Sequence, residues 1–166
     1  MSKNVGTLKR SNIRTLTRRM TLEDVPRVAE IDRLSFSLPW PERSFRFEVS
    51  DNPASRNWVV EADERVVAML VLWLIVDEAH IATIATHPDF RRRGIGERLL
   101  LEALIAAREE GARRAFLEVR AGNVAAQAMY RKYGFEIAGV RPHYYKDNKE
   151  DALLMNLESL NELEAG

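Results

Sequence analysis

A short glycine-containing turn between a strand pattern and a helix pattern is the feature that most constrains the fold of this chain. Residues 78–86 alternate as strand residues do, and His87-Pro88-Asp89 ends them. Apolar residues then recur on one helical face from about 95 to 110, where Gly111 ends the pattern. The turn between them reads Arg91-Arg92-Arg93-Gly94-Ile95-Gly96. A strand that leads so directly into an amphipathic helix predicts a sheet with helices packed on its faces.

The rest of the chain continues this mixture of strand and helix patterns. Ile13, Leu16 and Met20 indicate a weak first strand, and the hydroxyl of Thr21 can cap a helix at about 22–34. The remaining predicted elements are a two-proline loop at 37–41, a helix at 42–50, a hairpin of strands at 58–62 and 66–76, a strand at 114–120, a helix at 125–132, and strands at 135–140 and 153–157. This order predicts an α/β (α+β) fold with a mixed central sheet and about four flanking helices.

Length and composition favour a single globular domain. The 166 residues include 46% apolar residues, enough to bury a core, and we assign 12–158 to one domain. We expect a flexible N-terminal tail at 1–11 and a C-terminal tail at 159–166. The N-terminal residues lack the apolar run of a signal peptide, and the longest apolar run, 66–76, is about half of what a membrane span needs. We therefore expect a cytoplasmic protein with no membrane partner.

Charge and reactive side chains exclude several classes of protein. The 25 basic residues equal the 25 acidic ones, so net charge gives no reason to expect a direct nucleic-acid partner. The absence of cysteine excludes disulfide scaffolds, zinc ribbons, iron–sulfur clusters and cysteine nucleophiles. The three histidines, His80, His87 and His143, are far apart in the sequence, and we expect no metal site.

The turn at 91–96 has the features of an anion-binding site. The first amides of a helix lack acceptors within the helix, and the helix dipole adds positive charge there. Gly94 and Gly96 allow an anion to approach the backbone, and three arginines add charge. No Lys-Ser/Thr pair follows Gly96, as a P-loop requires, and Leu99 stands where a dinucleotide-binding motif has its third glycine. A basic connecting turn without a ligand is the alternative interpretation.

Two motifs together resemble those of a known family. R-x-x-G-x-G at the start of a long helix resembles the acetyl-CoA signature of the GNAT acetyltransferases, and Asn123–Phe135 resembles that family's N-x-x-A-x-x-x-Y-x-x-x-G-F pattern. Their order and separation also resemble the family's. Leu117–Arg120, the Pro39-Trp40 loop and His143-Tyr144-Tyr145 before Glu150-Asp151 narrow the resemblance to the RimI-type N-terminal acetyltransferases. The resemblance implies a sheet splayed between strands four and five, with acetyl-CoA bound there as a cosubstrate.

The resemblance also implies which segments bind acetyl-CoA. The backbone of Arg91, Arg92, Arg93, Gly94, Ile95 and Gly96 would hold the pyrophosphate. The backbone of Ile84, Ala85 and Thr86 would pair with the pantetheine arm, with the Ala85 amide directed at the thioester carbonyl. Asn123 would hydrogen-bond the cosubstrate, although asparagine is also a favoured helix N-cap and both roles can hold. An ordinary central strand is the alternative interpretation of 84–86.

Two residues carry the chemistry that the resemblance implies. Tyr130 would contact the CoA sulfur and act as general acid towards the leaving thiolate, and it too belongs to the cosubstrate site. Its alternative is a core aromatic at helical spacing. Glu118 lies between apolar neighbours in a strand, so its side chain points to the opposite face. The resemblance makes Glu118 the general base that deprotonates the incoming amine, and a salt bridge to an arginine is the alternative.

The acceptor peptide is expected between an aromatic loop and a later hairpin. Phe36, Leu38, Pro39 and Trp40 would form one wall, and the hydroxyls of Tyr144 and Tyr145 would bind the peptide backbone. Trp40 can instead fill an edge of the core. Residues 146–149 lack the glycine that the family often has before the Glu-Asp pair, which leaves the loop shape open.

The sequence as a whole predicts an enzyme that acetylates the N-terminal amine of a protein. A ribosomal protein is the substrate implied by the resemblance, and the acetyl group would move by direct attack in a ternary complex. A GNAT enzyme for lysine side chains or small amines, and a non-catalytic acyl-CoA-binding module, are the alternatives.

Overall fold

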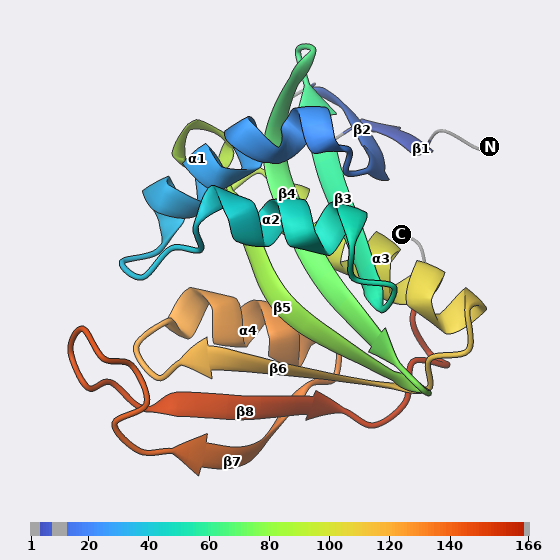
Figure 1. The fold of residues 1–166 in the computed structure, drawn as a ribbon. Helices are drawn as coiled ribbons and strands as arrows, with labels where there is room; N and C mark the ends of the chain where they lie inside the picture. The colour runs from blue at the N-terminus through green and yellow to red at the C-terminus, as the bar shows by residue number, and fades with distance from the viewer. Residues whose placement is uncertain (1–3, 8–12, 165–166) are drawn as a thin grey trace. The chain divides into compact units, whose positions relative to one another are not determined.

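The computed structural model describes residues 4–7 and 13–164, which contain both strands and helices (Figure 1). The helices are α1 (Val25–Ser35), α2 (Glu42–Ser50), α3 (Ile95–Glu109) and α4 (Val124–Lys132), with single 3₁₀ turns η1 (Leu22–Asp24) and η2 (Pro88–Phe90). The strands are β1 (Asn4–Thr7), β2 (Arg14–Arg19), β3 (Ser55–Ala62), β4 (Arg65–Ile75), β5 (Glu78–Thr86), β6 (Arg114–Arg120), β7 (Glu136–Arg141) and β8 (Ala152–Leu157).

The strands form a mixed sheet, as the sequence predicts. Their hydrogen-bonded order is β1-β2-β3-β4-β5-β6-β8-β7. The β5–β6 pair is parallel, whereas β1–β2, β2–β3, β6–β8 and β7–β8 are antiparallel. The parallel register covers only Glu78–His80 and Arg114–Phe116, so most of β5 and β6 lies outside the paired stretch. These are strands four and five of the predicted order, and the short pairing agrees with the predicted splay between them.

The N-terminal strand is the element that the sequence analysis did not predict. Asn4–Thr7 was expected within a flexible tail, but these residues form β1 and pair with Arg14–Thr17 of β2. Asn, Gly and Thr give this segment no apolar alternation, so its pairing depends on the neighbouring strand. The other residues of the predicted tail, 1–3 and 8–11, lie outside the described residues.

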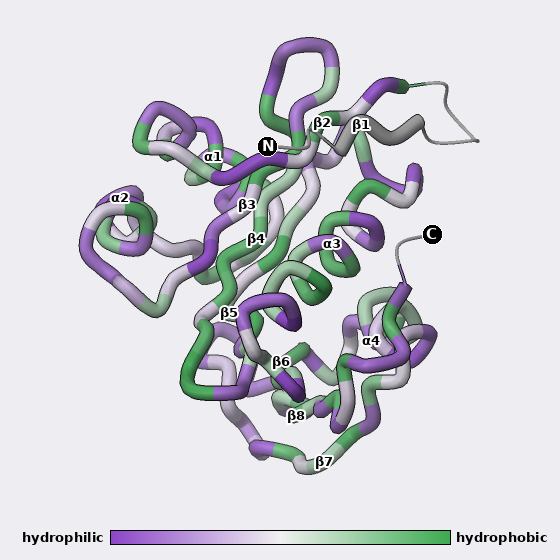
Figure 2. Tube along the Cα trace, turned by 90° about the vertical axis from the view of Figure 1, so that its right-hand side faces the viewer, coloured by the Kyte–Doolittle hydropathy of each residue, from purple (hydrophilic) through white to green (hydrophobic). Residues whose placement is uncertain are grey.

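The chain divides into two compact units, and it passes between them within β4, β5 and α3. The first unit comprises 1–72 and 82–103. Within it, α1 and α2 cover one face of β3 and β4, and the first turns of α3 cover the other (Figures 1 and 2). Figure 2 shows β4 as a largely hydrophobic strand between these layers. Fully buried side chains from all three layers form the core: Val25, Val28, Ile31, Phe45, Val67, Met69, Leu70, Leu99 and Leu100.

The predicted cap at Thr21 precedes the 3₁₀ turn η1, and α1 follows from Val25. The backbone N–H of Thr21 donates to Asp24 Oδ2 at 2.8 Å, and the Asp24 N–H donates to the Thr21 carbonyl at 3.0 Å. The Arg18 guanidinium pairs with both carboxylate oxygens of Asp24 at 2.7 and 2.8 Å. The helix entry is therefore fixed to β2, which sets the direction of α1 towards the loop that follows it.

The second unit comprises 73–81 and 104–166, and its sheet segment is covered on one face by α4 (Figure 1). Phe135 and Met155 are fully buried here, together with Leu104 from the end of α3. Residues of the predicted C-terminal tail belong to this packing, because Leu160 and Leu163 are buried. Arg108 Nη1 donates to the carbonyls of both leucines, at 2.8 and 2.7 Å.

Candidate active site

The turn after β5 contains two residues with positive φ angles. Arg92 and Gly94 have positive φ angles of 63° and 76°, whereas φ of Arg91 is −72°. These angles reverse the chain between the end of β5 and the start of α3. The first α-helical hydrogen bond runs from the Arg98 N–H to the Gly94 carbonyl at 3.1 Å. The amides of Ile95 and Gly96 precede that bond and so have no acceptor within the helix. The predicted strand–turn–helix geometry is therefore present.

The two glycines of this turn serve different purposes. Gly94 takes a backbone conformation that a side chain disfavours. Gly96 allows close packing, because a Cβ atom there would lie 3.1 Å from the Thr86 Oγ1 atom, closer than an ordinary contact. Helix α3 therefore starts directly against the end of β5, where Thr86 was predicted to contact the cosubstrate.

The side chain of Arg91 is occupied by contacts within the first unit. Its Nε donates to the Thr86 carbonyl at 2.9 Å, and its Nη2 donates to the Ser35 hydroxyl at 3.0 Å. Arg91, although exposed, therefore ties the turn to the end of α1. Arg93 lies over the Phe90 ring at 5.4 Å. Ser35 was not predicted, since nothing local in the sequence marks a partner 56 residues away.

The predicted peptide loop is held by a buried carboxylate that the sequence analysis missed. Asp32, 1% exposed in the last turns of α1, accepts a hydrogen bond from the Trp40 N–H at 2.7 Å. Burial raises the pKa of Asp32. The Trp40 N–H, the charge of Arg33 and the Thr83 hydroxyl lower this pKa, but by less. The Trp40 ring packs on Phe45 at 5.2 Å between ring centroids, so its core-filling alternative has structural support.

The same loop also presents apolar side chains to solvent. Phe36 and Leu38 are 37% and 50% exposed, and Leu34 at the end of α1 is 49% exposed. These three exposed apolar residues fall within five positions of the chain. Pro39 separates Leu38 from the anchored Trp40.

In the second unit, Glu118 lies on the exposed face of β6, as predicted. Its neighbours Leu117 and Val119 are each 5% exposed, while the Glu118 side chain is 33% exposed. Glu118 Oε1 lies 3.3 Å from Nη1 of Arg141, whose side chain is 53% exposed. The alternative interpretation, a salt bridge to an arginine, is therefore present. A solvated pair of this kind contributes about 0–1 kcal/mol, so it leaves the carboxylate able to bind another cation.

Tyr130 is a core residue with a polar end. Its side chain is 5% exposed, and its ring lies 5.7 Å from the ring of Phe135, as the core-aromatic alternative requires. Burial, with a smaller contribution from Tyr145, raises the pKa of Tyr130 to about 12. The phenol therefore keeps its proton throughout the neutral range and can act as a hydrogen-bond donor.

Asn123 caps α4, the role that its position in the sequence also allowed. Its side-chain oxygen accepts from the Ala126 N–H at 3.2 Å. Gln127, which was not predicted, is buried one turn later and donates to the carbonyls of Arg120 and Ala121 at 3.1 and 2.9 Å. These bonds fix the connection from β6 to α4, and with it the position of Tyr130 on the helix.

Tyr144 and Tyr145 lie together after β7, with ring centroids 5.2 Å apart. The Arg141 guanidinium lies 5.5 Å from the Tyr144 ring, and that of Arg120 lies 3.8 Å from the Tyr145 ring. Lys149 has φ of 57°, a conformation that favours glycine, in the stretch where the family often has one. The structure thus settles the loop shape that the sequence left open.

Within 4–7 and 13–164, no group of three or more histidine or carboxylate side chains is placed to hold a metal ion. In the same residues, no helix is both long and apolar enough to cross a membrane.

Comparison with known proteins decides the family. A model described as "Acetyltransferase (GNAT) family" matches residues 25–135, which include the 91–96 turn and the motif that ends at Phe135. The chain belongs to this family. The predicted GNAT fold and the acetyl-CoA-dependent N-acetyltransferase activity are thereby confirmed, since members of the family take the acetyl group from acetyl-CoA.

This GNAT enzyme resembles relatives over nearly their whole length. It is 38% identical over 143 residues to the [ribosomal protein bS18]-alanine N-acetyltransferase of Salmonella typhimurium, a match that covers 83% of this chain and 93% of the relative. It is 33% identical over 138 residues to the Escherichia coli K12 protein of that name, covering 81% and 90%. The crystal structure of the ribosomal-protein-S18-alanine N-acetyltransferase from Escherichia coli matches with a TM-score of 0.81 and 30% identity, covering 88% and 95%.

Proposed function

We propose that this GNAT enzyme transfers the acetyl group of acetyl-CoA to the N-terminal α-amine of a ribosomal protein. The proposed substrate is bS18, with alanine as the N-terminal residue that is acetylated. The observation that carries the proposal is the match to the Salmonella typhimurium bS18-alanine N-acetyltransferase across 93% of that protein. A cytoplasmic reaction follows from it, because ribosomal proteins are made there. No direct contact with nucleic acid or membrane is part of the proposal.

The first unit supplies the groups for the phosphates and the thioester. The amides of Gly94–Gly96, at the start of α3, bind the pyrophosphate of acetyl-CoA with help from the helix dipole. Arg92 and Arg93 add charge, whereas Arg91 holds the turn through Thr86 and Ser35. Backbone groups of Ile84–Thr86 align the pantetheine arm. The Ala85 N–H donates to the carbonyl oxygen as negative charge develops there.

Glu118 accepts the proton of the attacking amine, directly or through a water molecule. An α-ammonium has a pKa of about 7.7–8.0, so its deprotonation at pH 7 costs about 1 kcal/mol at 1.36 kcal/mol per unit. The same step for a lysine, with a pKa of about 10.4, costs about 4.6 kcal/mol. A solvated carboxylate paired with one exposed arginine suits the easier step. This difference favours an N-terminal amine over a lysine side chain.

Tyr130 acts on the leaving group of the reaction, the CoA thiolate. The amine nitrogen bonds to the acetyl carbon, the carbon–sulfur bond breaks, and the CoA thiolate leaves. A thiol has a pKa of about 8.5, well below the value of about 12 for Tyr130. Full proton transfer from the phenol to the thiolate is therefore uphill, and Tyr130 stabilises the thiolate by donating a hydrogen bond.

A matched pair of peptides tests the proposal. One peptide begins with a free alanine and contains one internal lysine, and the other has the same sequence with its α-amine chemically blocked. With acetyl-CoA, the protein is expected to release CoA with the first peptide only. Equal rates with both peptides would instead support the lysine-acetylating alternative, and acetyl-CoA binding without CoA release would support a non-catalytic module.

A further inference from the structure

A single guanidinium at the end of β6 organises the loop that carries Tyr145. Arg120 Nη1 donates to Asp147 Oδ1 at 3.2 Å and to Glu150 Oε1 at 3.3 Å, and its Nη2 donates to Asp147 Oδ2 at 3.2 Å. Nη1 also lies 3.3 Å from the Asn148 side-chain oxygen. The face of the same guanidinium stacks on the Tyr145 ring at 3.8 Å. An arginine can donate hydrogen bonds in the plane of its guanidinium and can stack the face of that group on an aromatic ring, and Arg120 does both.

Further contacts fix Glu150 to the start of α4. The Gly122 N–H donates to Glu150 Oε2 at 2.5 Å, and a Cβ on Gly122 would lie 2.6 Å from that oxygen. The hydrogen bond from Gly122, with smaller contributions from Asn148 and Arg120, lowers the pKa of Glu150, so the carboxylate stays ionised. Although burial opposes its charge, the bonds to Asp147 and Glu150 raise the pKa of Arg120.

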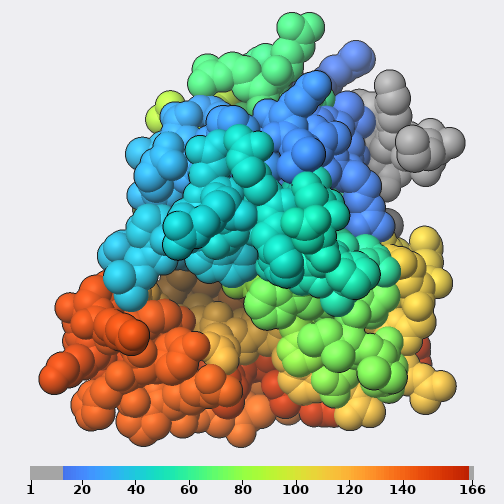
Figure 3. Space-filling model, in the orientation of Figure 1, coloured from blue at the N-terminus to red at the C-terminus, as the bar shows by residue number. Residues whose placement is uncertain are grey.

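The loop needs such support because its backbone is strained in two places. His143 and Lys149 have φ angles of 54° and 57°, in the left-handed region that costs a residue with a Cβ about 1–2 kcal/mol. Backbone bonds from Tyr145 to Glu150 and from Lys149 to Tyr145, at 3.2 and 2.8 Å, close the loop on itself. Figure 3 shows this loop at the surface, in orange to red at the lower left, where solvent competes for its hydrogen bonds.

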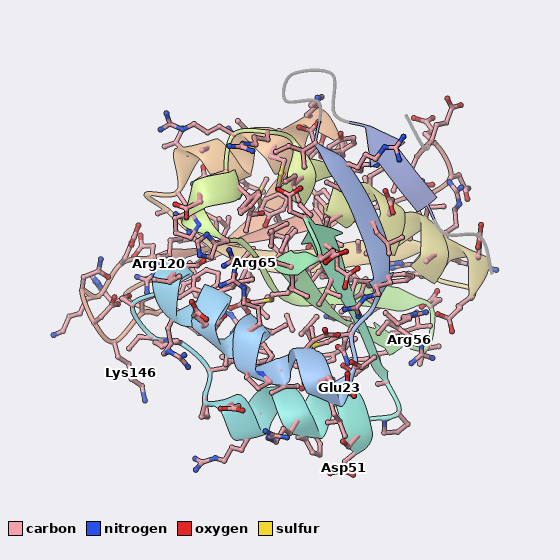
Figure 4. All side chains as sticks on the ribbon, turned by 90° about the horizontal axis from the view of Figure 1, so that it is seen from above. Glu23, Asp51, Arg56, Arg65, Arg120 and Lys146 are labelled. Carbon is pink, nitrogen blue, oxygen red and sulfur yellow. The ribbon has the colours of Figure 1, made fainter. Side chains whose placement is uncertain are left out.

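Arg120 also connects the loop to the proposed base. Arg120 and Glu118 are two residues apart on β6, so their side chains leave the strand on the same face. Burial raises the pKa of Tyr145, the positive charge of Arg120 lowers it, and the negative charge of Glu118 raises it. Figure 4 labels both Arg120 and Lys146, which belong to the second unit.

We infer that Arg120 is a positioning residue that holds the 143–150 loop, and with it Tyr145, in the conformation that binds the acceptor peptide. The inference rests on the proposed function, since it takes the peptide as the ligand of this loop. Arg120 itself contacts neither substrate in this account. Loss of its anchor is expected to weaken peptide binding and to leave acetyl-CoA binding and the chemical step intact.

Arg120→Lys is the sharpest test, because it keeps the charge and removes the planar set of donors and the stacking face. The Michaelis constant for an alanine-terminated peptide should rise roughly tenfold, a loss near 1.4 kcal/mol. The Michaelis constant for acetyl-CoA and kcat should stay within about twofold. Trypsin should cleave after Lys146 or Lys149 several times faster. The matched control is Arg114→Lys, which changes an exposed arginine at the other end of β6. It should change neither the peptide Michaelis constant nor the rate of trypsin cleavage.

A second substitution separates positioning from general stability. Lys149→Gly relieves the positive φ, so adding it to Arg120→Lys should recover part of the peptide affinity and slow the cleavage again. The inference is overturned if Arg120→Lys leaves both the peptide Michaelis constant and the cleavage rate unchanged. It is also overturned if the substitution raises the Michaelis constants for the peptide and for acetyl-CoA equally. If the wild-type protein acetylates no α-amine while Arg120→Lys still speeds cleavage, the proposed function fails and the anchoring of the loop stands.

Discussion

The backbone N–H of Trp40 donates to Oδ2 of Asp32 at 2.7 Å, so the end of α1 fixes the position of the loop that follows it. The carboxylate is almost fully buried, and it lies in the last turns of a helix, where the dipole disfavours negative charge. Burial is the largest cause of its raised pKa. The loop that we assign to peptide binding is thus attached to the Asp32 carboxylate, whose negative charge is disfavoured by burial and by the helix dipole.

Asp32→Asn should stabilise the protein more at neutral pH than in acid. Because the folded-state pKa is raised above the ordinary 3.8, the stability of the wild-type protein is fully present below that value and declines as pH rises through the folded-state pKa. Asparagine does not titrate and can still accept from the Trp40 N–H. Urea unfolding of both proteins from pH 4 to 7 measures the difference. The prediction is wrong if the difference in unfolding free energy between Asp32→Asn and the wild type stays constant from pH 4 to 7, or if the wild type becomes relatively more stable as pH rises.

Glu118→Gln should lower kcat at least tenfold and leave the affinity for acetyl-CoA within about twofold. The amide keeps the size of the side chain and removes the proton acceptor. Steady-state kinetics with an alanine-terminated peptide, and calorimetric titration of acetyl-CoA, provide the two measurements. Glu136→Gln, an exposed carboxyl-to-amide change on β7, is the control and should retain full kcat. Equal kcat in Glu118→Gln and the wild type would remove the base role.

Tyr130→Phe should lower kcat about tenfold while changing stability by about 1 kcal/mol or less, because the ring stays in the core. Since the pKa of Tyr130 is about 12, the phenol stays protonated, and the ratio of wild-type to variant kcat should be constant from pH 7 to 10. Tyr133→Phe is the control and should keep its activity. A ratio that falls towards one below pH 10 would show that the phenol titrates earlier than the structure implies.

Gly94→Ala should weaken acetyl-CoA binding roughly tenfold, because a side chain at φ of 76° costs about 1–2 kcal/mol and distorts the 91–96 turn. Gly111→Ala offers a matched comparison at the other end of α3. Its φ is 108°, and a Cβ there meets nothing within 4 Å, so it should lose stability and keep its affinity for acetyl-CoA. Calorimetry and urea unfolding on both variants test this. Equal loss of affinity in the two would mean that the turn has no specific part in binding.

The sequence predicts the elements of this fold well because each carries local signals. The helix expected at 95–110 runs from Ile95 to Glu109, and the strands expected at 78–86 and 114–120 have those bounds. Apolar periodicity, caps and breakers are short-range properties, so they can be read without the tertiary structure. β1 is the exception, because its few polar residues become a strand only through pairing with β2.

The candidate site is predicted less completely, because much of it consists of contacts between distant residues. Arg91 with Ser35, Arg120 with Asp147, and Asp32 with Trp40 involve side chains whose partners no local pattern specifies. Glu118 illustrates the limit: alternation along β6 gives the face of its side chain, but the partner Arg141 comes from another strand. The catalytic roles of Glu118 and Tyr130 stay predictions, which the substitutions above test.

Localisation of the acetyl group on a ribosomal protein is the most direct test of the central claim. Purified bS18 with a free N-terminal alanine would be incubated with this protein and acetyl-CoA, and the modified site mapped by tandem mass spectrometry. We expect an acetyl group on the α-amine of the N-terminal alanine and none on internal lysines. Acetylation confined to lysine side chains, or an unmodified bS18 after complete incubation, would contradict it.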